Sequence, residues 1–261
     1  MKKGICIGSL PGGSLEEQFA SAARYGFQGI EVNTLRNDAA RLEVKQLSEH
    51  FGLPIISVMN SDHWQYPLSD PDPLVVERSL VGITQSIDTA AYLGADTVLI
   101  VPAVVKPDVP YEAAWARSVQ AIRKVLPLAE NKRIHLAVEN VWNKFLLSPL
   151  EFAAYVDEFR SEYLAAYFDV GNILLYGYPH QWIQTLGKRI KKIHIKGFDV
   201  HKTAFTYLTE GTVDWVSVTT ALCAVGYDGY VTAELPIDKG NPLGRLRQTS
   251  LDMDKILAYA P

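Results

Sequence analysis

Short apolar runs alternate along the chain with longer segments in which apolar residues recur every three or four positions. The first pattern is typical of strands buried on both faces, and the second of amphipathic helices. The predicted strands cover residues 5–10, 29–33, 54–60, 95–101, 135–139, 164–169, 189–199 and 230–235. The predicted helices cover residues 15–25, 38–51, 74–93, 111–131, 149–159, 179–186, 214–225 and 243–259.

Residue types at the ends of these segments support the boundaries. Ser14 precedes the first helix, and Glu17 follows it three positions later, which is the signature of a capping box. A glycine follows each of the first two helices, where helices commonly end. Pro127 is predicted to break or kink the end of the helix over 111–131, because proline lacks a backbone N–H.

Strict alternation of strands and helices predicts a parallel sheet. Eight such units in 261 residues match the length of one (β/α)₈ barrel. No low-complexity linker or shift in composition divides the chain. We therefore predict an α/β protein with one domain, a (β/α)₈ TIM barrel over residues 1–261.

The composition narrows the classes of partner. A formal net charge of −4 argues against nucleic acid, because phosphate binding calls for a basic face. The two cysteines, Cys6 and Cys223, lack the spacing of a metal-ligand pair or a disulfide framework, which fits a reducing compartment and a cytoplasmic protein. No export signal is recognised, and no apolar stretch approaches the length of a membrane span.

Four polar residues stand near the C-terminal ends of the last four predicted strands. Glu139, Asp169 and Glu234 each follow an apolar residue, and His194 lies between two isoleucines. An unpaired buried carboxylate is costly, so these groups are expected to share a cation. The active site of a (β/α)₈ barrel lies at the C-terminal strand ends, and the last four strands are neighbours. The four side chains can therefore converge.

Three carboxylates and one imidazole suit one divalent metal ion, with Mn²⁺ or Mg²⁺ favoured and Co²⁺ or Zn²⁺ as alternatives. Four protein ligands leave two positions of a six-coordinate ion for an α-hydroxy carbonyl, whose enediolate the ion would stabilise. Glu139 and Glu234 would then serve as acid and base next to a ketose carbonyl. Proton return on the opposite face gives an epimer, and return to a different carbon gives an aldose–ketose isomer; the sequence leaves both open.

Four motifs carry a resemblance to a known family: Val138-Glu139-Asn140, Phe168-Asp169-Val170-Gly171-Asn172, Ile193-His194-Ile195-Lys196 and Ala233-Glu234-Leu235. In this order they resemble the xylose-isomerase-like TIM barrels, which include sugar and sugar-phosphate epimerases and isomerases. The resemblance implies that Glu139, Asp169, His194 and Glu234 bind one metal ion. Asn172 stands where many ketose 3-epimerases have histidine, and this form resembles the L-xylulose-5-phosphate 3-epimerase branch.

Four further residues are candidates for binding a small sugar or sugar phosphate. His63 and Trp64 leave the third predicted strand, and His63 is either a hydrogen-bond partner of a substrate hydroxyl or a loop histidine. Lys196 shares a strand face with His194 and either binds a substrate oxygen or phosphate or reaches solvent. Asn140 either contacts the substrate or caps the strand end, and Asn172 is the neutral counterpart of the family's histidine.

Other functions on the same barrel remain in view. An inosose- or dehydroshikimate-type dehydratase also removes a proton next to a carbonyl. A type IV endonuclease acting at abasic sites is disfavoured, because related enzymes carry additional histidines where this chain has Val101-Pro102-Ala103 and Asn172. A barrel that binds sugar without turnover is disfavoured by the paired carboxylates. Homo-oligomers are common in the family that the chain resembles.

Glu31, after the second predicted strand, is expected to pair with a neighbouring cation or to support the site indirectly.

Overall fold

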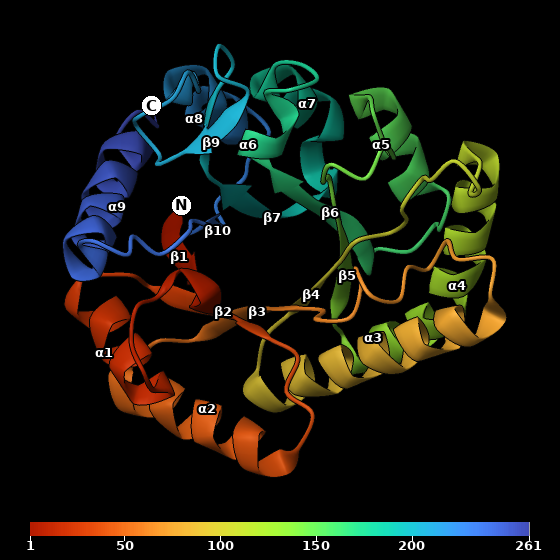
Figure 1. The fold of residues 1–261 in the computed structure, drawn as a ribbon, viewed down its shortest axis with the longest axis horizontal. Helices are drawn as coiled ribbons and strands as arrows, with labels where there is room; N and C mark the ends of the chain where they lie inside the picture. Colours follow the sequence, from red (N-terminus) through yellow and green to blue (C-terminus); the bar gives the residue numbers. More distant parts are fainter. Residues whose placement is uncertain (261) are drawn as a thin grey trace.

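Eight parallel strands close into a barrel in the computed structural model, which describes residues 1–260 (Figure 1). Around the ring the order is β1-β10-β7-β6-β5-β4-β3-β2, so the first and last barrel strands are neighbours. The barrel strands are β1 (Lys2–Cys6), β2 (Gly29–Asn33), β3 (Ile55–Met59), β4 (Thr97–Ile100), β5 (His135–Glu139), β6 (Leu164–Asp169), β7 (Ile190–Ile195) and β10 (Tyr230–Ala233). The predicted (β/α)₈ fold is confirmed.

Helices surround the barrel and bury their apolar faces against the outer faces of its strands (Figure 1). They are α1 (Leu15–Arg24), α2 (Asp38–Phe51), α3 (Pro73–Leu93), α4 (Tyr111–Lys132), α5 (Pro149–Asp157), α6 (Val170–Ile173), α7 (Pro179–Leu186), α8 (Trp215–Ala224) and α9 (Pro242–Leu257), with 3₁₀ helices over Ile7–Ser9 and Gly187–Arg189. Among residues 1–260, none of the helices combines the length and apolar composition needed to cross a bilayer.

Several predicted boundaries shift by one or two residues, and the predictions for the first strand and for Pro127 differ more from the structure. The first strand was expected over residues 5–10, but β1 ends at Cys6 and a 3₁₀ helix follows. Pro127 was expected to break or kink the end of its helix, yet α4 continues beyond it to Lys132. Val125 and Ala129, on either side of the proline, are buried, so packing offsets the hydrogen bond that proline cannot make.

The strand predicted over residues 189–199 is divided in the structure, because β7 ends at Ile195 and residues 197–199 belong to a separate hairpin. Two short antiparallel strands, β8 (Gly197–Asp199) and β9 (Ala204–Thr206), form a hairpin beside the barrel end. Phe205 in β9 stacks on Trp142, with ring centroids 4.7 Å apart, and also contacts Phe198. The hairpin thus brings an aromatic cluster to the end of the barrel where the strands finish.

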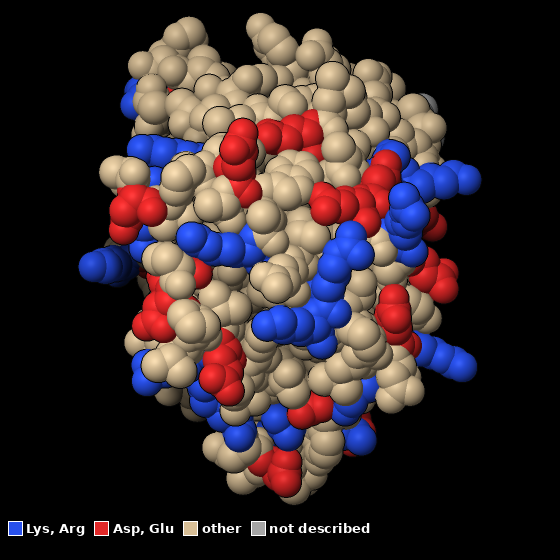
Figure 2. Space-filling view, turned by 90° about the vertical axis from the view of Figure 1, so that its right-hand side faces the viewer, with Lys and Arg blue, Asp and Glu red and all other residues tan. Residues whose placement is uncertain are grey.

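One side of the molecule is covered by α3, α4 and α5, and its charges are mixed. In the space-filling view acidic and basic side chains are interspersed over this face instead of gathering by sign (Figure 2). Several of them pair across elements, as Lys132 does with Asp88 at 2.7 Å. This face therefore offers no continuous basic surface.

Candidate active site

Four side chains meet at the C-terminal end of the barrel. Glu139 and Asp169 are the last residues of β5 and β6, His194 is the next-to-last residue of β7, and Glu234 follows β10. One ligand atom from each lies within 4.8 Å of the others. The first three side chains are buried, and that of Glu234 is 32% exposed. The structure therefore brings together the four residues that the sequence selected.

Backbone hydrogen bonds hold Asp169 in this position. Asn140 donates from Nδ2 to the carbonyl oxygen of Asp169 and accepts at Oδ1 from its N–H, both at 2.8 Å. Asp169 Oδ1 accepts from the N–H of Asn172 and so caps α6, while Asn172 Nδ2 donates to the carbonyl oxygen of Asn140. Both ends of the Asn140 amide are thus engaged in tying β5 to β6.

Lys196 enters the cluster just beyond β7. Its Nζ lies 3.0 Å from Asp169 Oδ2 and also pairs with Glu234 Oε2, and it sits over the ring of Phe205. Burial alone would lower the pKa of this ammonium, but the charges of Asp169 and Glu234 raise it above its usual value. Lys196 is therefore a fixed positive charge among the acids.

The donor set fits a divalent cation. Asp169 Oδ2 is buried and has no hydrogen-bond partner, although it is within ion-pair distance of Lys196. Burial, together with the charges of Glu234 and Asp169, raises the pKa of Glu139 to about 7 despite its bond to His194. Carboxylates crowded in this way with one imidazole are the ligands that Mn²⁺ and Mg²⁺ accept.

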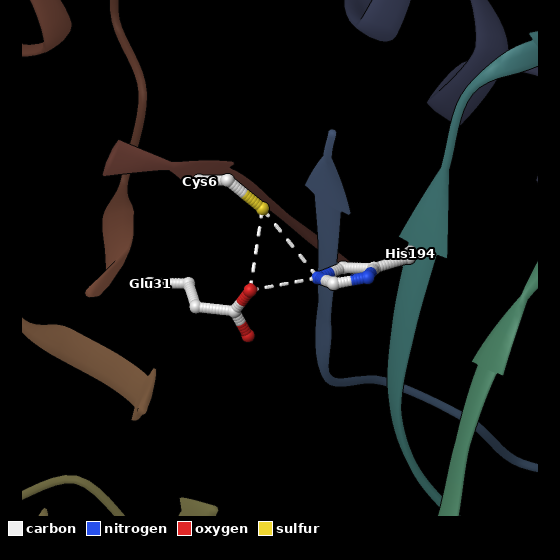
Figure 3. Close-up of side chains that lie close together, drawn as sticks. All are labelled: Cys6, Glu31 and His194. Atoms are coloured by element: carbon white, nitrogen blue, oxygen red, sulfur yellow. Dashed lines mark hydrogen bonds and ion pairs between the residues drawn. The ribbon is translucent and has the colours of Figure 1, made fainter. Parts of the chain in front are cut away.

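A second group of side chains holds the other nitrogen of His194 (Figure 3). His194 Nδ1 lies 2.9 Å from Glu139 Oε1, and Nε2 lies 2.9 Å from Glu31 Oε1. Cys6 Sγ donates to the same Glu31 oxygen at 3.2 Å. Burial would raise the pKa of Glu31, but the charge of His194 and the hydrogen bonds that Glu31 accepts lower it to about 2.

The sequence did not identify this second group as part of the site. Cys6 has no ligand-type spacing, and position 31 was expected to pair with an unspecified cation or to act indirectly. The signal that could have found them is position: Cys6 ends β1, and Glu31 lies in β2, so both approach the barrel end that holds the acids. Only the closed ring, in which β1 pairs with β10, brings the ends of β1 and β2 close to the end of β7.

His63 is buried beside the site, which a solvent-exposed loop histidine would not be. It is 5% exposed, lies edge-on to Trp64, and its Nδ1 has no hydrogen-bond partner. Burial lowers its pKa to about 4 against the opposing charges of Glu234, Asp62 and Glu31. The imidazole is therefore neutral at physiological pH.

A cavity of about 490 Å³ opens next to the cluster. Lys196 and Glu234 form its polar side, and Met59, Phe205 and Leu235 contribute an apolar wall. Trp142 supports Phe205 from behind and donates from Nε1 to the carbonyl oxygen of Asn172. The cavity can hold a molecule with one polar and one apolar face, as a small sugar has.

Comparisons with known proteins agree with this geometry. Residues 19–255 match the family described as xylose isomerase-like TIM barrel. A protein of Haemophilus influenzae that carries the provisional name L-ribulose-5-phosphate 3-epimerase is 24% identical over 245 residues, which cover 86% of this chain and 84% of that protein.

Two solved structures share the fold over nearly their whole length. The D-psicose 3-epimerase of Clostridium cellulolyticum H10 superposes with a TM-score of 0.84 at 18% identity, covering 100% of this chain and 99% of that chain. The 3-keto-D-glucoside 4-epimerase of E. coli gives a TM-score of 0.84 at 18% identity, covering 98% of this chain and 99% of that chain.

Proposed function

Because the chain belongs to the xylose isomerase-like TIM barrel family, we propose that it is a divalent-metal-dependent epimerase of a ketose or ketose phosphate. The names of its relatives support an epimerase: one is called a ribulose-phosphate 3-epimerase and another is a psicose 3-epimerase. The reaction would remove and return a proton at the carbon next to the carbonyl.

Glu139, Asp169, His194 through Nδ1 and Glu234 would hold one ion, Mn²⁺ or Mg²⁺ by the character of their donors. When bound, the ion would stabilise negative charge that develops on the substrate carbonyl oxygen. Lys196 would release Asp169 and Glu234 and turn toward a substrate oxygen in the cavity that it lines.

The placement of the two glutamates carries the proposal. Glu139 comes from β5 and Glu234 follows β10, with β6 and β7 between them in the ring. They nevertheless approach the same imidazole, with Oε1 of Glu139 at 2.9 Å and Oε2 of Glu234 at 3.9 Å from His194 Nδ1. A substrate between them would lose its C–H proton to one carboxylate and receive a proton from the other on the opposite face, which inverts the carbon.

Four further residues would support substrate binding, two of them directly. His63 is neutral and presents an unpartnered Nδ1, which suits a hydrogen bond to a substrate hydroxyl. Asn140 and Asn172 would act mainly by holding Asp169, since their present hydrogen bonds bind the strand ends; a direct contact with substrate would have to replace one of these bonds. Phe205 would cover the apolar face of the sugar.

The test is incubation of the Mn²⁺-loaded protein in D₂O with ketoses and their 5-phosphates. We expect deuterium at C3 together with formation of the C3 epimer. Glu139→Gln and Glu234→Gln should each reduce turnover by roughly 10²- to 10⁴-fold, the usual contribution of a positioned acid or base. Glu49→Gln, which changes an exposed glutamate on α2, is the matched control.

Four results would contradict the proposal. Deuterium at C1 or C2 with an aldose as product indicates an isomerase, and loss of water indicates a dehydratase. Deuterium at C4 indicates epimerisation at the neighbouring carbon, as the name of the 4-epimerase describes. Cleavage of abasic DNA without exchange into any sugar would replace the proposal with the endonuclease.

A further inference from the structure

The imidazole of His194 is fixed from both sides. Its side chain is fully buried and packs beside Tyr167, with ring centroids 4.4 Å apart. Nδ1 faces the carboxylate of Glu139, and Nε2 faces that of Glu31, each at 2.9 Å. A histidine can bind a metal ion only through a nitrogen that carries no proton. Metal binding at this site therefore depends on which nitrogen of His194 carries the proton.

Glu31 is built as an acceptor for one of these nitrogens. It is 1% exposed, and its Oε2 accepts from Ser57 Oγ at 2.6 Å and from Tyr167 OH at 2.7 Å. These two hydroxyls come from β3 and β6 and hold the carboxylate on both sides, while Oε1 is left for His194 and Cys6. The carboxylate therefore has one orientation, and a donor must stand opposite Oε1.

We propose that Glu31 is a positioning residue that keeps the proton of His194 on Nε2 and so directs the lone pair of Nδ1 toward Glu139, Asp169 and Glu234. Partners of this kind fix the tautomer and ring orientation of metal-binding histidines. The inference rests on the metal site of the proposed function but not on the identity of the sugar. Glu31 itself does not touch the substrate or the ion.

A competing interpretation is that Cys6, Glu31 and Nε2 of His194 hold an ion of their own, since their atoms also lie within 4.8 Å of one another. The hydrogen bonds favour positioning. Cys6 donates to Glu31, and the other oxygen of Glu31 already takes two hydroxyl donors. All three side chains lie inside the barrel at 3% exposure or less.

Glu31→Gln separates the two interpretations without changing the shape of the side chain. The hydroxyls of Ser57 and Tyr167 favour the amide oxygen at the Oε2 position, which turns the amide N–H₂ toward Nε2 of His194. A donor there requires an unprotonated Nε2, and the proton moves to Nδ1. We expect Mn²⁺ to bind about 10- to 100-fold more weakly, measured by electron paramagnetic resonance of the free ion.

The tautomer is measured independently of activity. In protein labelled with ¹⁵N-histidine and loaded with Mg²⁺, two-bond ¹H–¹⁵N correlations report which nitrogen of each imidazole carries a proton. The signal of His194, one of six histidines, is identified by its loss in His194→Gln. We expect a proton on Nε2 in the wild type and on Nδ1 in Glu31→Gln. A proton on Nδ1 in the Mg²⁺-loaded wild type would overturn the inference.

Two more variants complete the design. Glu31→Asp keeps the charge but withdraws it from Nε2, and it should weaken Mn²⁺ binding to a similar extent. This variant provides the test if Glu31→Gln fails to fold. Cys6→Ser keeps a donor to Glu31 and should bind one equivalent of Mn²⁺ or Co²⁺ with an affinity within a few-fold of wild type. Loss of a second equivalent of Co²⁺ in Cys6→Ser would overturn the inference in favour of a second site.

The inference and the proposed function can fail separately. A wild type that binds Mn²⁺ but epimerises no ketose, with Glu31→Gln weakened as expected, overturns only the function. An active epimerase whose Glu31→Gln variant binds Mn²⁺ within twofold of wild type overturns only the role of Glu31.

Discussion

The two halves of the barrel hold opposite sides of one imidazole. The second half supplies the groups around Nδ1 of His194, namely Glu139 from β5, Asp169 from β6 and Glu234 after β10. The first half supplies most of the groups around Nε2, with Cys6 from β1, Glu31 from β2 and Ser57 from β3. Glu234 and Cys6 both line the cavity, whereas Glu31 is 1% exposed and hydrogen-bonded at both oxygens.

The polar atoms of these two groups of side chains are satisfied differently. Asp169 retains a buried oxygen without a hydrogen-bond partner, and the acids around it share the charge of Lys196. Glu31 has a partner at each oxygen. Unsatisfied polar groups are costly when buried, so they persist where a ligand repays the cost.

The greatest loss of Mn²⁺ affinity is expected from a change at Asp169. Asp169→Asn removes one negative charge, while the backbone bonds from Asn140 and the cap of α6 can both remain. We expect Mn²⁺ affinity to fall by more than the roughly 10- to 100-fold expected for Glu31→Gln, with turnover lost. Calorimetric titration with Mn²⁺ measures the affinity, and an unchanged thermal transition of the metal-free protein is the control. Equal losses of Mn²⁺ affinity in Asp169→Asn and Glu31→Gln would contradict the assignment of Asp169 as a metal ligand and of Glu31 as a positioning residue.

A smaller loss of Mn²⁺ affinity is expected from removing one of the hydrogen bonds that hold Glu31. Tyr167→Phe removes the hydroxyl that donates to Glu31 Oε2 and leaves Ser57 in place. We expect the free energy of unfolding to fall by about 1.5–3 kcal/mol, as for a hydrogen bond to a charged group. Urea denaturation of the metal-free protein measures this change. Mn²⁺ affinity should fall less than in Glu31→Gln. A larger fall would mean that Tyr167, not Glu31, orients the imidazole of His194.

The smallest effect is expected at the hairpin, which belongs to neither half. Phe205→Ala removes part of the apolar wall of the cavity, together with the stacking of Phe205 on Trp142. Loss of an aromatic contact should raise KM by about two- to tenfold with kcat nearly unchanged. Leu150→Ala, at a 74% exposed position on α5, is the control. A fall in kcat with unchanged KM would place the hairpin in the chemical step instead of in substrate binding.

The convergence of the four polar residues at the strand ends was predictable, because local pattern and barrel geometry agree there. A carboxylate at the end of an apolar run is conspicuous, and the fold brings consecutive strand ends together. The contacts of Glu31 with His194, Ser57 and Tyr167 were not predictable, because strands buried on both faces give no sign of which side chains point into the barrel. Tyr167 and Phe168 are both fully buried, yet only Tyr167 reaches Glu31.

Three other features also lay beyond local pattern. The hairpin of β8 and β9 is too short for a period to be read, with three residues in each strand. The burial of His63 depends on the packing of a loop, which its neighbours in the sequence do not encode. The partners of Cys6 became evident only through ring closure, which sets β1 against β10.

The pairing of β1 with β10 has a consequence for biosynthesis. β1 and β10 lie side by side (Figure 1), with Ile5 in register with Ala233. Cys6 and Glu234 therefore reach the same end of the barrel from opposite ends of the chain. During synthesis Cys6 emerges from the ribosome long before Glu234. Until His194 has also emerged, the partly made chain contains Glu31 without the histidine that it orients. Assembly of the centre is therefore a late event in folding, and a chain shortened before β10 would lack both a closed ring and one of its two glutamates.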